Sequence, residues 1–387
     1  MRHFDQLASD VRDALFHQLP QAFDRDSERQ VLAQALGATL YVPATKGELA
    51  GTVRRQAAGG ARAMVIDLED AIPDVSVDSA LTSTSETLRD LNADPPESQL
   101  FVRVRSADQI RRLADELGTS LSVVSGFVLP KFSVKSGREY LQAVADAGAQ
   151  SAHALYAMPV LETREVLYRE TRELELVGIR ELLDEFRGLV LTIRIGATDL
   201  CGLYGIRRDR DLSIYDVGVA ADLITQIVNQ LGRTDGTGFA ITGPVWEYFA
   251  NHERILRPQL RQTPFDDRQA AGLRRQLMST DLDGLMRETM LDRANGLTGK
   301  SVIHPSHVAP VHALAVVPHE EYLDALDVVH PESAHGGVRK SEYRNKMNEM
   351  RPHRIWAERT MLRAQVFGVA GPSISHVDIL YAQQDCA

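Results

Sequence analysis

The chain has few of the residues that mark several classes of protein. It contains only two cysteines, Cys201 and Cys386, which are too few for a disulfide framework and favour a reducing compartment. It also has no excess of basic residues, because 53 acidic side chains outnumber 43 lysines and arginines and give a net charge of -10. A chain with this charge offers no basic surface to a phosphate backbone, so we expect no nucleic-acid partner.

Long apolar runs are absent as well. No run approaches the roughly 18 residues that a membrane helix needs. The first residues, MRHFDQLASD, have neither the basic region nor the apolar core of a signal peptide. We therefore expect a cytoplasmic protein that does not associate with membranes.

The composition that is present is typical of a soluble enzyme, with 44% hydrophobic and 25% charged residues. The 387 residues suffice for one large domain with additions, or for two of ordinary size. A β/α barrel uses about 250 residues. One barrel with flanking pieces is therefore the simplest interpretation.

Short runs rich in valine, isoleucine and leucine alternate with longer segments of helical pattern. This alternation is typical of a parallel sheet with crossover helices, and eight such units close a barrel. The sequence therefore predicts an α/β protein with a (β/α)₈ TIM-barrel fold. The eight expected strands are Thr39–Pro43, Ala63–Leu68, Leu100–Val104, Gly126–Pro130, Leu155–Leu161, Leu189–Ile195, Phe239–Thr242 and Lys300–Ile303.

Three regions follow from this count: an N-terminal helical extension (1–37), the barrel (38–317) and a C-terminal helical segment (318–387). The first is expected to form an amphipathic helix that covers the bottom of the barrel. In the last, a helix is expected from about Ser341 to Phe367. Within the barrel, the helical pattern from Arg164 to Arg187 is long for one crossover, so two helices broken at Gly178 are expected.

Polar residues stand where the expected strands end, which is where a β/α barrel carries its functional groups. Glu162 and Asp199 follow neighbouring strands and form a hard-oxygen pair of the kind that Mg²⁺ prefers. An arginine on the opposite wall would hold a substrate carboxylate through two parallel hydrogen bonds. Acidic residues at strand ends also cap helices and form salt bridges, so the pair by itself leaves both interpretations open.

Eight short motifs, one per expected strand, follow one another along the chain: LYVPA (40–44), MVIDLEDA (64–71), FVRV (101–104), VLPK (128–131), LET (161–163), GATDL (196–200), TGP (242–244) and GKSVIHPSHV (299–308). Together they resemble the citrate lyase beta-subunit and malyl-CoA lyase family, also called the HpcH/HpaI aldolase group. The segments GATDL followed by CGLYGIRR, TGPVWEYF and VVPHEEYLDA resemble one branch more closely, named as a C–C bond lyase of the barrel fold and associated with tellurite-resistance-type gene clusters.

The resemblance implies a Mg²⁺-dependent carbon–carbon lyase or aldolase that breaks or forms the bond between an enolate carbon and a 2-oxo acid. It implies Glu162 and Asp199 as metal ligands and Arg103 as the group that grips the oxo-acid and stabilises the developing charge. It also implies acids that hold water or substrate at Glu69 and Asp70, with Asp70 our candidate general base. The predicted substrate-binding set is Arg103, Glu69, Gly196, Ala197, Thr198, Gly243 and Pro244, with the backbone N–H groups of Gly196 and Ala197 as a carboxylate cradle.

The chain also departs from the family pattern. Arg105 and Ser106 stand where the family commonly has an asparagine after FVRV, and the stretch between Glu162 and Asp199 is longer than usual. No segment matches a coenzyme A site, which leaves open whether the substrate is a CoA thioester. The family assembles as trimers or hexamers, so a homo-oligomer is expected.

Other polar residues admit a functional and a structural interpretation. Lys131 is most simply a cation that balances the nearby acids, and His304 fits the capping of a short helix. Cys201 is expected to pack, whereas Trp246 and Tyr248 could line a pocket or pack. The arginines Arg207, Arg208 and Arg210 could meet an anionic substrate tail or lie in a solvated loop.

The leading hypothesis is a Mg²⁺-dependent lyase acting on a small oxo- or hydroxy-acid. One alternative is phosphoryl transfer of the phosphoenolpyruvate type, which would require Arg207 or Arg208 to face the metal. Another is a barrel that binds an oxo-acid without turning it over.

Overall fold

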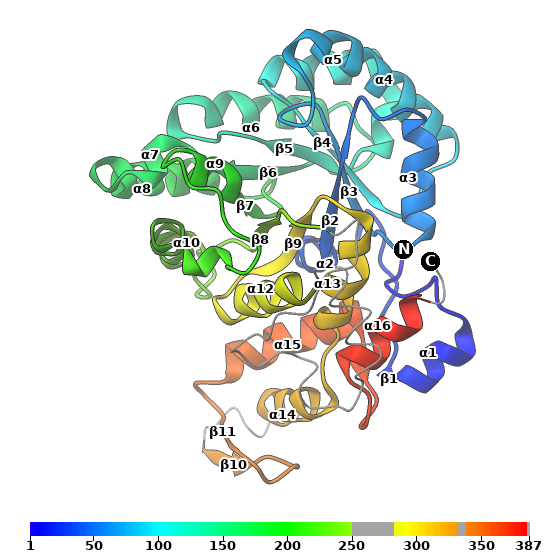
Figure 1. The fold of residues 1–387 in the computed structure, drawn as a ribbon, viewed down its shortest axis with the longest axis vertical. Coiled ribbons are helices and arrows are strands. Elements are labelled where there is room, and N and C mark those ends of the chain that lie inside the picture. The colour runs from blue at the N-terminus through cyan, green and yellow to red at the C-terminus, as the bar shows by residue number, and fades with distance from the viewer. Residues whose placement is uncertain (250–281, 331–336, 385–387) are drawn as a thin grey trace.

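A computed structural model describes residues 1–249, 282–330 and 337–384. Eight parallel strands close a barrel in chain order, and a helical segment lies outside it between successive strands (Figure 1). The predicted (β/α)₈ fold is therefore confirmed, and each expected strand is found within a few residues of its predicted bounds. The barrel strands are β2 (Ala38–Pro43), β3 (Ala63–Asp67), β4 (Gln99–Arg103), β5 (Gly126–Leu129), β6 (Tyr156–Leu161), β7 (Ile193–Ile195), β8 (Ile241–Trp246) and β9 (Thr298–Val302).

The helices bury one face against this barrel. In α5, apolar side chains at Ile110, Leu113, Ala114 and Leu117 recur at helical spacing and are buried, and the helix ends before Gly118, whose φ of 52° is left-handed. The outer helices are α3 (Leu49–Ala58), α4 (Val77–Ala93), α5 (Ala107–Leu117), α6 (Val134–Gly148), α7 (Arg164–Leu167), α8 (Arg169–Glu185), α9 (Ala197–Gly202), α10 (Gly218–Leu231), α12 (Leu282–Ala294) and α13 (Val308–Ala315). Short 3₁₀ turns are η1 (Asp74–Ser76), η2 (Gly118–Val123), η3 (Ile214–Asp216) and η4 (Pro305–His307).

The predicted break at Gly178 is wrong. Two helices are present, but the chain leaves the helical conformation at Tyr168, and Gly178 lies inside α8. A Cβ atom at Gly178 would lie 2.7 Å from Cγ2 of Val134 on α6. The glycine therefore lets α8 approach α6 closely rather than ending a helix.

Residues 1–37 cover the bottom of the barrel, as expected, but not as one helix. They form α1 (Ser9–Leu15), the strand β1 (Phe16–Gln18) and α2 (Arg29–Ala35). Three contacts reach the amino-terminal side of the barrel strands: Arg25 donates to the carbonyl of Val123 at 2.7 Å, Arg62 to that of Arg2 at 2.8 Å, and Gln99 to that of Leu32 at 3.2 Å.

The C-terminal segment packs beside this N-terminal extension, below the barrel in Figure 1. It contains α14 (His319–Val329), α15 (Arg354–Phe367) and α16 (His376–Gln384), a hairpin of β10 (Val338–Lys340) and β11 (Met347–Glu349), and β12 (Val369–Ala370), which pairs antiparallel with β1. The helix expected from Ser341 therefore begins only at Arg354. Asn348 and Lys346 instead bind Asp324 of α14 at 2.8 and 2.7 Å, which holds this stretch in the hairpin.

Both end segments contribute side chains to the core that the barrel and its helices share, among them Phe4, Leu7, Phe367 and Leu380. The division into three regions stays a prediction. Of the helices in the described residues, none combines the length and apolar character that crossing a bilayer requires.

Candidate active site

A pocket of about 850 Å³ opens at the carboxyl ends of the barrel strands. Residues of β2, β4, β6, β7, β8 and β9 line it, together with the short helices α7 and α9 that follow β6 and β7. These two helices lie next to each other (Figure 1), with the rings of Tyr168 and Tyr204 6.1 Å apart. The lining includes Tyr41, Asp70, Arg103, Lys131, Glu162, Arg194, Gly196, Ala197, Thr198, Asp199 and Ser301.

Glu162 directly follows β6 and is 4% exposed. One carboxylate oxygen accepts a hydrogen bond of 2.7 Å from the amide of Lys131. Burial, and then the negative charge of Asp199, raise the pKa of Glu162 to about 7. The other oxygen, Oε2, lies against Gly196, where a Cβ atom would come within 2.5 Å of Cβ and 2.8 Å of Cδ of Glu162. A glycine at 196 therefore makes room for this carboxylate.

Asp199 lies in the first turn of α9, on the next strand-to-helix connection, and its side chain is 32% exposed. Burial raises its pKa, although the Lys131 ammonium, 3.8 Å from Oδ1, acts in the opposite direction. The structure thus brings Glu162 and Asp199, predicted as a pair, into one pocket.

Arg103 ends β4 and binds Asp67 of β3 through a two-point contact, Nε to Oδ1 at 2.6 Å and Nη2 to Oδ2 at 2.7 Å. Nη1 lies 3.1 Å from Glu69 and 3.4 Å from Asp70. Burial alone would lower the pKa of the Arg103 guanidinium, but the hydrogen bonds and charge of Asp67 raise it. The residue therefore stays charged, is held in one orientation by Asp67, and lines the pocket.

Lys131 contacts the acidic side chains next to Arg103. Its ammonium forms an ion pair with Glu69 and lies 3.5 Å from Asp70. Burial and the hydrogen bond with Asp70 raise the pKa of Glu69. Burial acts in the same direction on Asp70, but the hydrogen bond with Glu69 and the charge of Arg103 outweigh it and lower the pKa of Asp70. Asp70 is half exposed and faces the pocket, so it is the acid here that stays ionised and accessible.

Arg105, which departs from the family pattern, holds the loop that carries these acids. Its guanidinium donates to the carbonyls of Leu68 at 2.9 Å and of Glu69 and Ile72 at 2.8 Å. It also forms an ion pair with Asp74. The arginine therefore positions the loop rather than the substrate.

The carboxylate cradle predicted from Gly196 and Ala197 needs a correction at its first residue. The N–H of Gly196 already donates to the carbonyl of Leu161 at 3.2 Å, because Gly196 continues the ladder between β6 and β7. Ala197 and Thr198 line the pocket, and the Thr198 hydroxyl donates to Glu247 at 2.9 Å. Their contact with substrate stays a prediction.

Gly243 and Pro244 lie apart from this group. Within the described part of the chain, neither is among the residues that line the pocket. A Cβ atom at Gly243 would collide with the carboxylate of Asp292 on α12, so this residue faces the outer helix. Asp292 in turn receives a hydrogen bond of 2.7 Å from Lys300 of β9.

Arg194, in the middle of β7, is a charged lining residue that was not singled out in the sequence. It is 1% exposed and lies inside the barrel, over the ring of Tyr41. The sequence did contain a signal for this residue. Arg194 stands between two isoleucines in a run that was predicted to be a buried strand. Strand periodicity alone does not say whether such a residue has a counter-ion.

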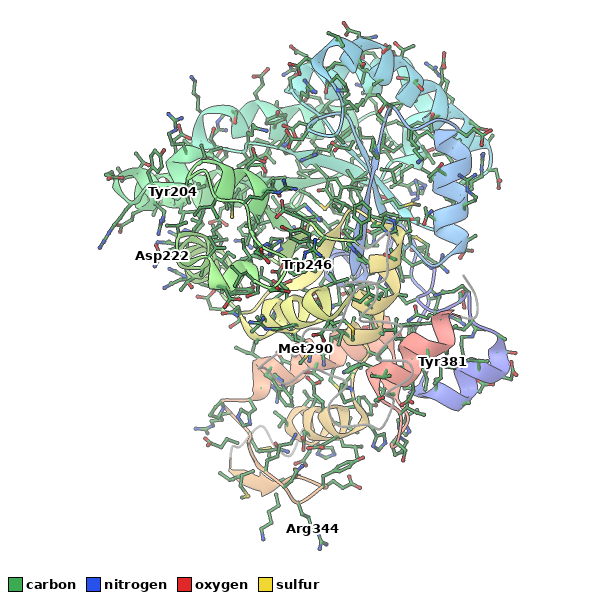
Figure 2. All side chains as sticks on the ribbon, viewed as in Figure 1. Tyr204, Asp222, Trp246, Met290, Arg344 and Tyr381 are labelled. Carbon is green, nitrogen blue, oxygen red and sulfur yellow. The ribbon has the colours of Figure 1, made fainter. Side chains whose placement is uncertain are left out.

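His304 and Arg208, two of the remaining polar candidates, have structural partners. His304 accepts a hydrogen bond of 3.3 Å from the amide of Ser306 and so caps η4, as expected. Cys201 is buried, which raises the pKa of its thiol. Arg208 is buried in an ion pair with Glu288, and its guanidinium lies 5.1 Å from the Trp246 ring centroid. Trp246 itself packs beside α12 (Figure 2).

The donor set of the pocket suits a hard divalent cation. Two carboxylates with raised pKa values meet there, and a cation would stabilise both in the charged form. Among the described residues, no group of three or more histidine, cysteine or acidic side chains could hold a metal ion. A site with two protein carboxylates is the form that Mg²⁺ uses, since water and substrate supply its other ligands.

Comparison with known proteins identifies the family to which the chain belongs. The sequence model of the family described as "C-C_Bond_Lyase of the TIM-Barrel fold" matches residues 30–369. No curated protein matches the sequence.

Several solved structures share the fold. CitE from Mycobacterium tuberculosis, in complex with magnesium, acetoacetate and coenzyme A, is 20% identical with a TM-score of 0.52, over 86% of this chain and 99% of that one. A citrate lyase from Burkholderia xenovorans LB400 is 15% identical with a TM-score of 0.60, over 89% and 96%. Haloferax volcanii malate synthase, in a magnesium and glyoxylate complex, is 16% identical with a TM-score of 0.51, over 73% and 76%.

The predicted C–C bond lyase branch is thus confirmed, whereas its association with tellurite-resistance-type clusters stays a prediction. The family model covers the chain from α2 to β12 and includes every strand of the barrel. The chain therefore belongs to the family of C–C bond lyases of the TIM-barrel fold, and it is a carbon–carbon lyase.

Proposed function

We propose that this protein is a Mg²⁺-dependent lyase that cleaves or forms the bond between an enolate carbon and the carbonyl carbon of a 2-oxo acid. The observation that supports this most directly is the arrangement of Glu162 and Asp199. They follow adjacent strands and line one pocket with Arg103. Their pKa values are raised, and a bound cation would lower them again.

Each side chain has a role that its contacts support. A Mg²⁺ ion bound by Glu162 and Asp199 would act as a Lewis acid toward the oxo-acid oxygens. Arg103, fixed by Asp67, lines the pocket and would stabilise negative charge as it develops there. Asp70 is ionised and exposed to the pocket, so it can take the hydroxyl proton of the substrate directly or through one water.

The phosphoryl-transfer alternative has less support. It would require Arg207 or Arg208 to face the metal, and neither is among the described residues that line the pocket. Arg208 is instead buried against Glu288. The substrate is therefore proposed as an oxo- or hydroxy-acid, with a CoA thioester as a further candidate form.

Calorimetric titration of the purified protein with pyruvate, glyoxylate and oxaloacetate tests the proposal. We expect binding that requires Mg²⁺, and Glu162→Gln should weaken Mg²⁺ binding by at least about 100-fold, because even second-shell partners of a metal contribute about 10- to 100-fold. Glu165→Gln is the matched control, since Glu165 is an exposed glutamate that lines the same pocket from α7.

The control should bind Mg²⁺ and oxo-acid as the unmodified protein does. The proposal fails if the unmodified protein binds none of the three acids in the presence of Mg²⁺. It also fails if Glu162→Gln binds the ion as tightly as the unmodified protein.

A further inference from the structure

Arg194 is a cation inside the barrel whose contacts in the described residues are all to neutral groups. Nη2 donates to the hydroxyl of Ser301 at 2.5 Å, and Nη1 lies 3.4 Å from the hydroxyl of Thr39 and 3.8 Å from the sulfur of Met158. Nε is buried and has no hydrogen-bond partner there. Arg194 forms no ion pair with an acidic side chain in the described part of the chain. Burying a charge without such a partner costs free energy.

Other buried cations of the described chain are compensated. Lys300 binds Glu288 and Asp292 at 2.9 and 2.7 Å, and Arg208 pairs with Glu288. Arg62 has three main-chain carbonyl acceptors, at 2.8, 2.8 and 3.1 Å. Two hydroxyls and a thioether supply much less negative charge, so Arg194 differs from these cations in the partners it has.

The uncompensated guanidinium lines the proposed active-site pocket. Arg194 belongs to its wall together with Tyr41, Val160 and Ser301. Lys131 and Arg103 are the cations that act most strongly on Glu162 and Asp199, and Arg194 is not among them, so these acids do not serve as its counter-ions. An anionic group that enters the pocket is therefore the partner that Arg194 lacks.

The ring of Tyr41 lies close to both Arg194 and Arg103. The guanidinium carbon of Arg103 lies 5.2 Å from the centre of the Tyr41 ring, and that of Arg194 lies 5.5 Å from it. Two cations thus stand around one aromatic ring, one held by acids and the other not. Because both guanidinium groups lie close to the same ring of the pocket wall, a small diacid can bind Arg103 with one anionic group and extend the other toward Arg194.

We propose that Arg194 binds a second carboxylate of the substrate, so that the lyase acts on oxo-acids that carry a carboxylate on the arm extending into the barrel. This rests on the proposed function, because it assumes that the oxo-acid occupies this pocket. A planar carboxylate can accept two parallel hydrogen bonds from a guanidinium. It would also give the buried charge a partner when the substrate is bound.

Matched acids of equal carbon number test the inference. In calorimetry with Mg²⁺, oxaloacetate is compared with 2-oxobutyrate, and 2-oxoglutarate with 2-oxovalerate, so that each pair differs by a carboxylate in place of a methyl group. We expect the unmodified protein to bind at least one diacid about 10-fold or more tightly than its monoacid partner. In Arg194→Met that ratio should approach one, while monoacid binding changes by less than about threefold.

Arg169→Met is the control, since Arg169 is an exposed arginine at the start of α8 that is not among the residues lining the pocket, and the diacid preference of this variant should be unchanged. If Arg194→Met does not fold, Arg194→Lys replaces it, and it should keep only part of the preference because lysine lacks the two-point contact. The difference in Tm that diacid and monoacid produce gives a second readout.

The inference is overturned if the unmodified protein binds both members of each pair equally, or if Arg194→Met weakens both members by the same factor. Either result leaves the proposed function standing. Absence of Mg²⁺-dependent binding for all four acids would overturn the inference, and absence of binding for pyruvate and glyoxylate as well would overturn the proposed function.

Discussion

At the scale of single residues, the proposed metal site depends on the ionisation of Glu162. Burial, and then the charge of Asp199, place its pKa at about 7. A metal ligand must be deprotonated, so protons compete with Mg²⁺ for this carboxylate. A glutamate in water would be ionised well below that pH.

Mg²⁺ affinity is therefore expected to depend on pH. It should be nearly constant above pH 7 and fall by about 10-fold for each pH unit below it, because one proton must leave for each ion bound. Titrations between pH 5.5 and 8 measure this, and Glu165→Gln should follow the same curve. A constant affinity from pH 5.5 to 8 would contradict the assignment of Glu162 as a ligand.

The substitution Gly196→Ala tests the space beside this carboxylate. The added methyl group would lie 2.5 Å from Cβ of Glu162, so the carboxylate must move, and we expect Mg²⁺ affinity to drop by at least about 10-fold. Gly202→Ala is the control, because nothing lies within 4 Å of that position in the same short helix. Equal Mg²⁺ affinity in both variants would show that Gly196 does not set the position of Glu162.

At the scale of elements, the first and last strands of the barrel meet at Gly37. Its carbonyl accepts from the amide of Lys300 at 2.7 Å, and the next amide, that of Ala38, donates to Nε2 of His312 on α13 at 3.2 Å. The φ of Gly37 is 48°, and a Cβ atom there would lie 2.8 Å from the His312 ring. Both features require a residue without a side chain.

We expect Gly37→Ala to destabilise the fold by about 2 kcal/mol or more, through left-handed backbone strain and the clash with His312. Urea unfolding monitored by circular dichroism measures the change. Gly188→Ala, at an exposed position with nothing within 4 Å, should stay within about 0.5 kcal/mol of the unmodified protein. If the two variants were equally stable, position 37 would not require a glycine.

At the scale of the whole molecule, buried histidines lie where the end segments pack against the barrel. His3 of the N-terminal extension and His312 of α13 have ring centres 4.6 Å apart, and His376 of α16 hydrogen-bonds the carbonyl of Ala313 at 2.8 Å. Burial lowers the pKa of His307 and His376 to about 4 and that of His312 to about 3, and it lowers the pKa of His3 in the same direction. These side chains are therefore neutral in the folded protein at neutral pH.

Stability is expected to fall as the pH drops from about 6.5 toward 4. In this range the unfolded chain takes up protons on these histidines and the folded protein does not, so unfolding becomes more favourable, by up to about 3 kcal/mol for each fully effective site. Above pH 6.5 neither state is protonated and the contribution is complete. Denaturant unfolding at pH 7.5, 6 and 5 measures the slope.

His312→Gln should flatten that slope, because an amide does not titrate, whereas His17→Gln, at an exposed position, should leave it unchanged. Equal slopes in all three proteins would exclude His312 as a source of the acid sensitivity.

Much of the fold was predictable because its signals are local. Each barrel strand is a short apolar run, and β3 is buried over its whole length, so a run such as Ala63–Asp67 is visible without knowledge of its neighbours. Alternation with helices then implies parallel strands whose carboxyl ends share one face. Glu162, Asp199, Arg103 and Asp70 could be placed together from this rule alone.

Elements outside the repeating pattern were predicted less well. Gly178 was expected to break a helix, but its role depends on Val134 of a different helix. The stretch from Ser341 was expected to be helical, but it pairs as a hairpin whose polar side chains bind Asp324. Both differences arise from contacts between segments that are distant in the sequence.

The sequence by itself determined the eight-stranded barrel and the edge at which its polar residues gather, Glu162 and Asp199 among them, because these depend on the order of residues along single strands. Only the tertiary structure decided which charges compensate one another. It paired Arg103 with Asp67, buried Lys300 between Glu288 and Asp292, and left Arg194 inside the barrel among neutral groups. A residue's charge can be seen in the sequence, but its counter-ion comes from a different strand or helix, so the electrostatics of the pocket exist only once the barrel has closed.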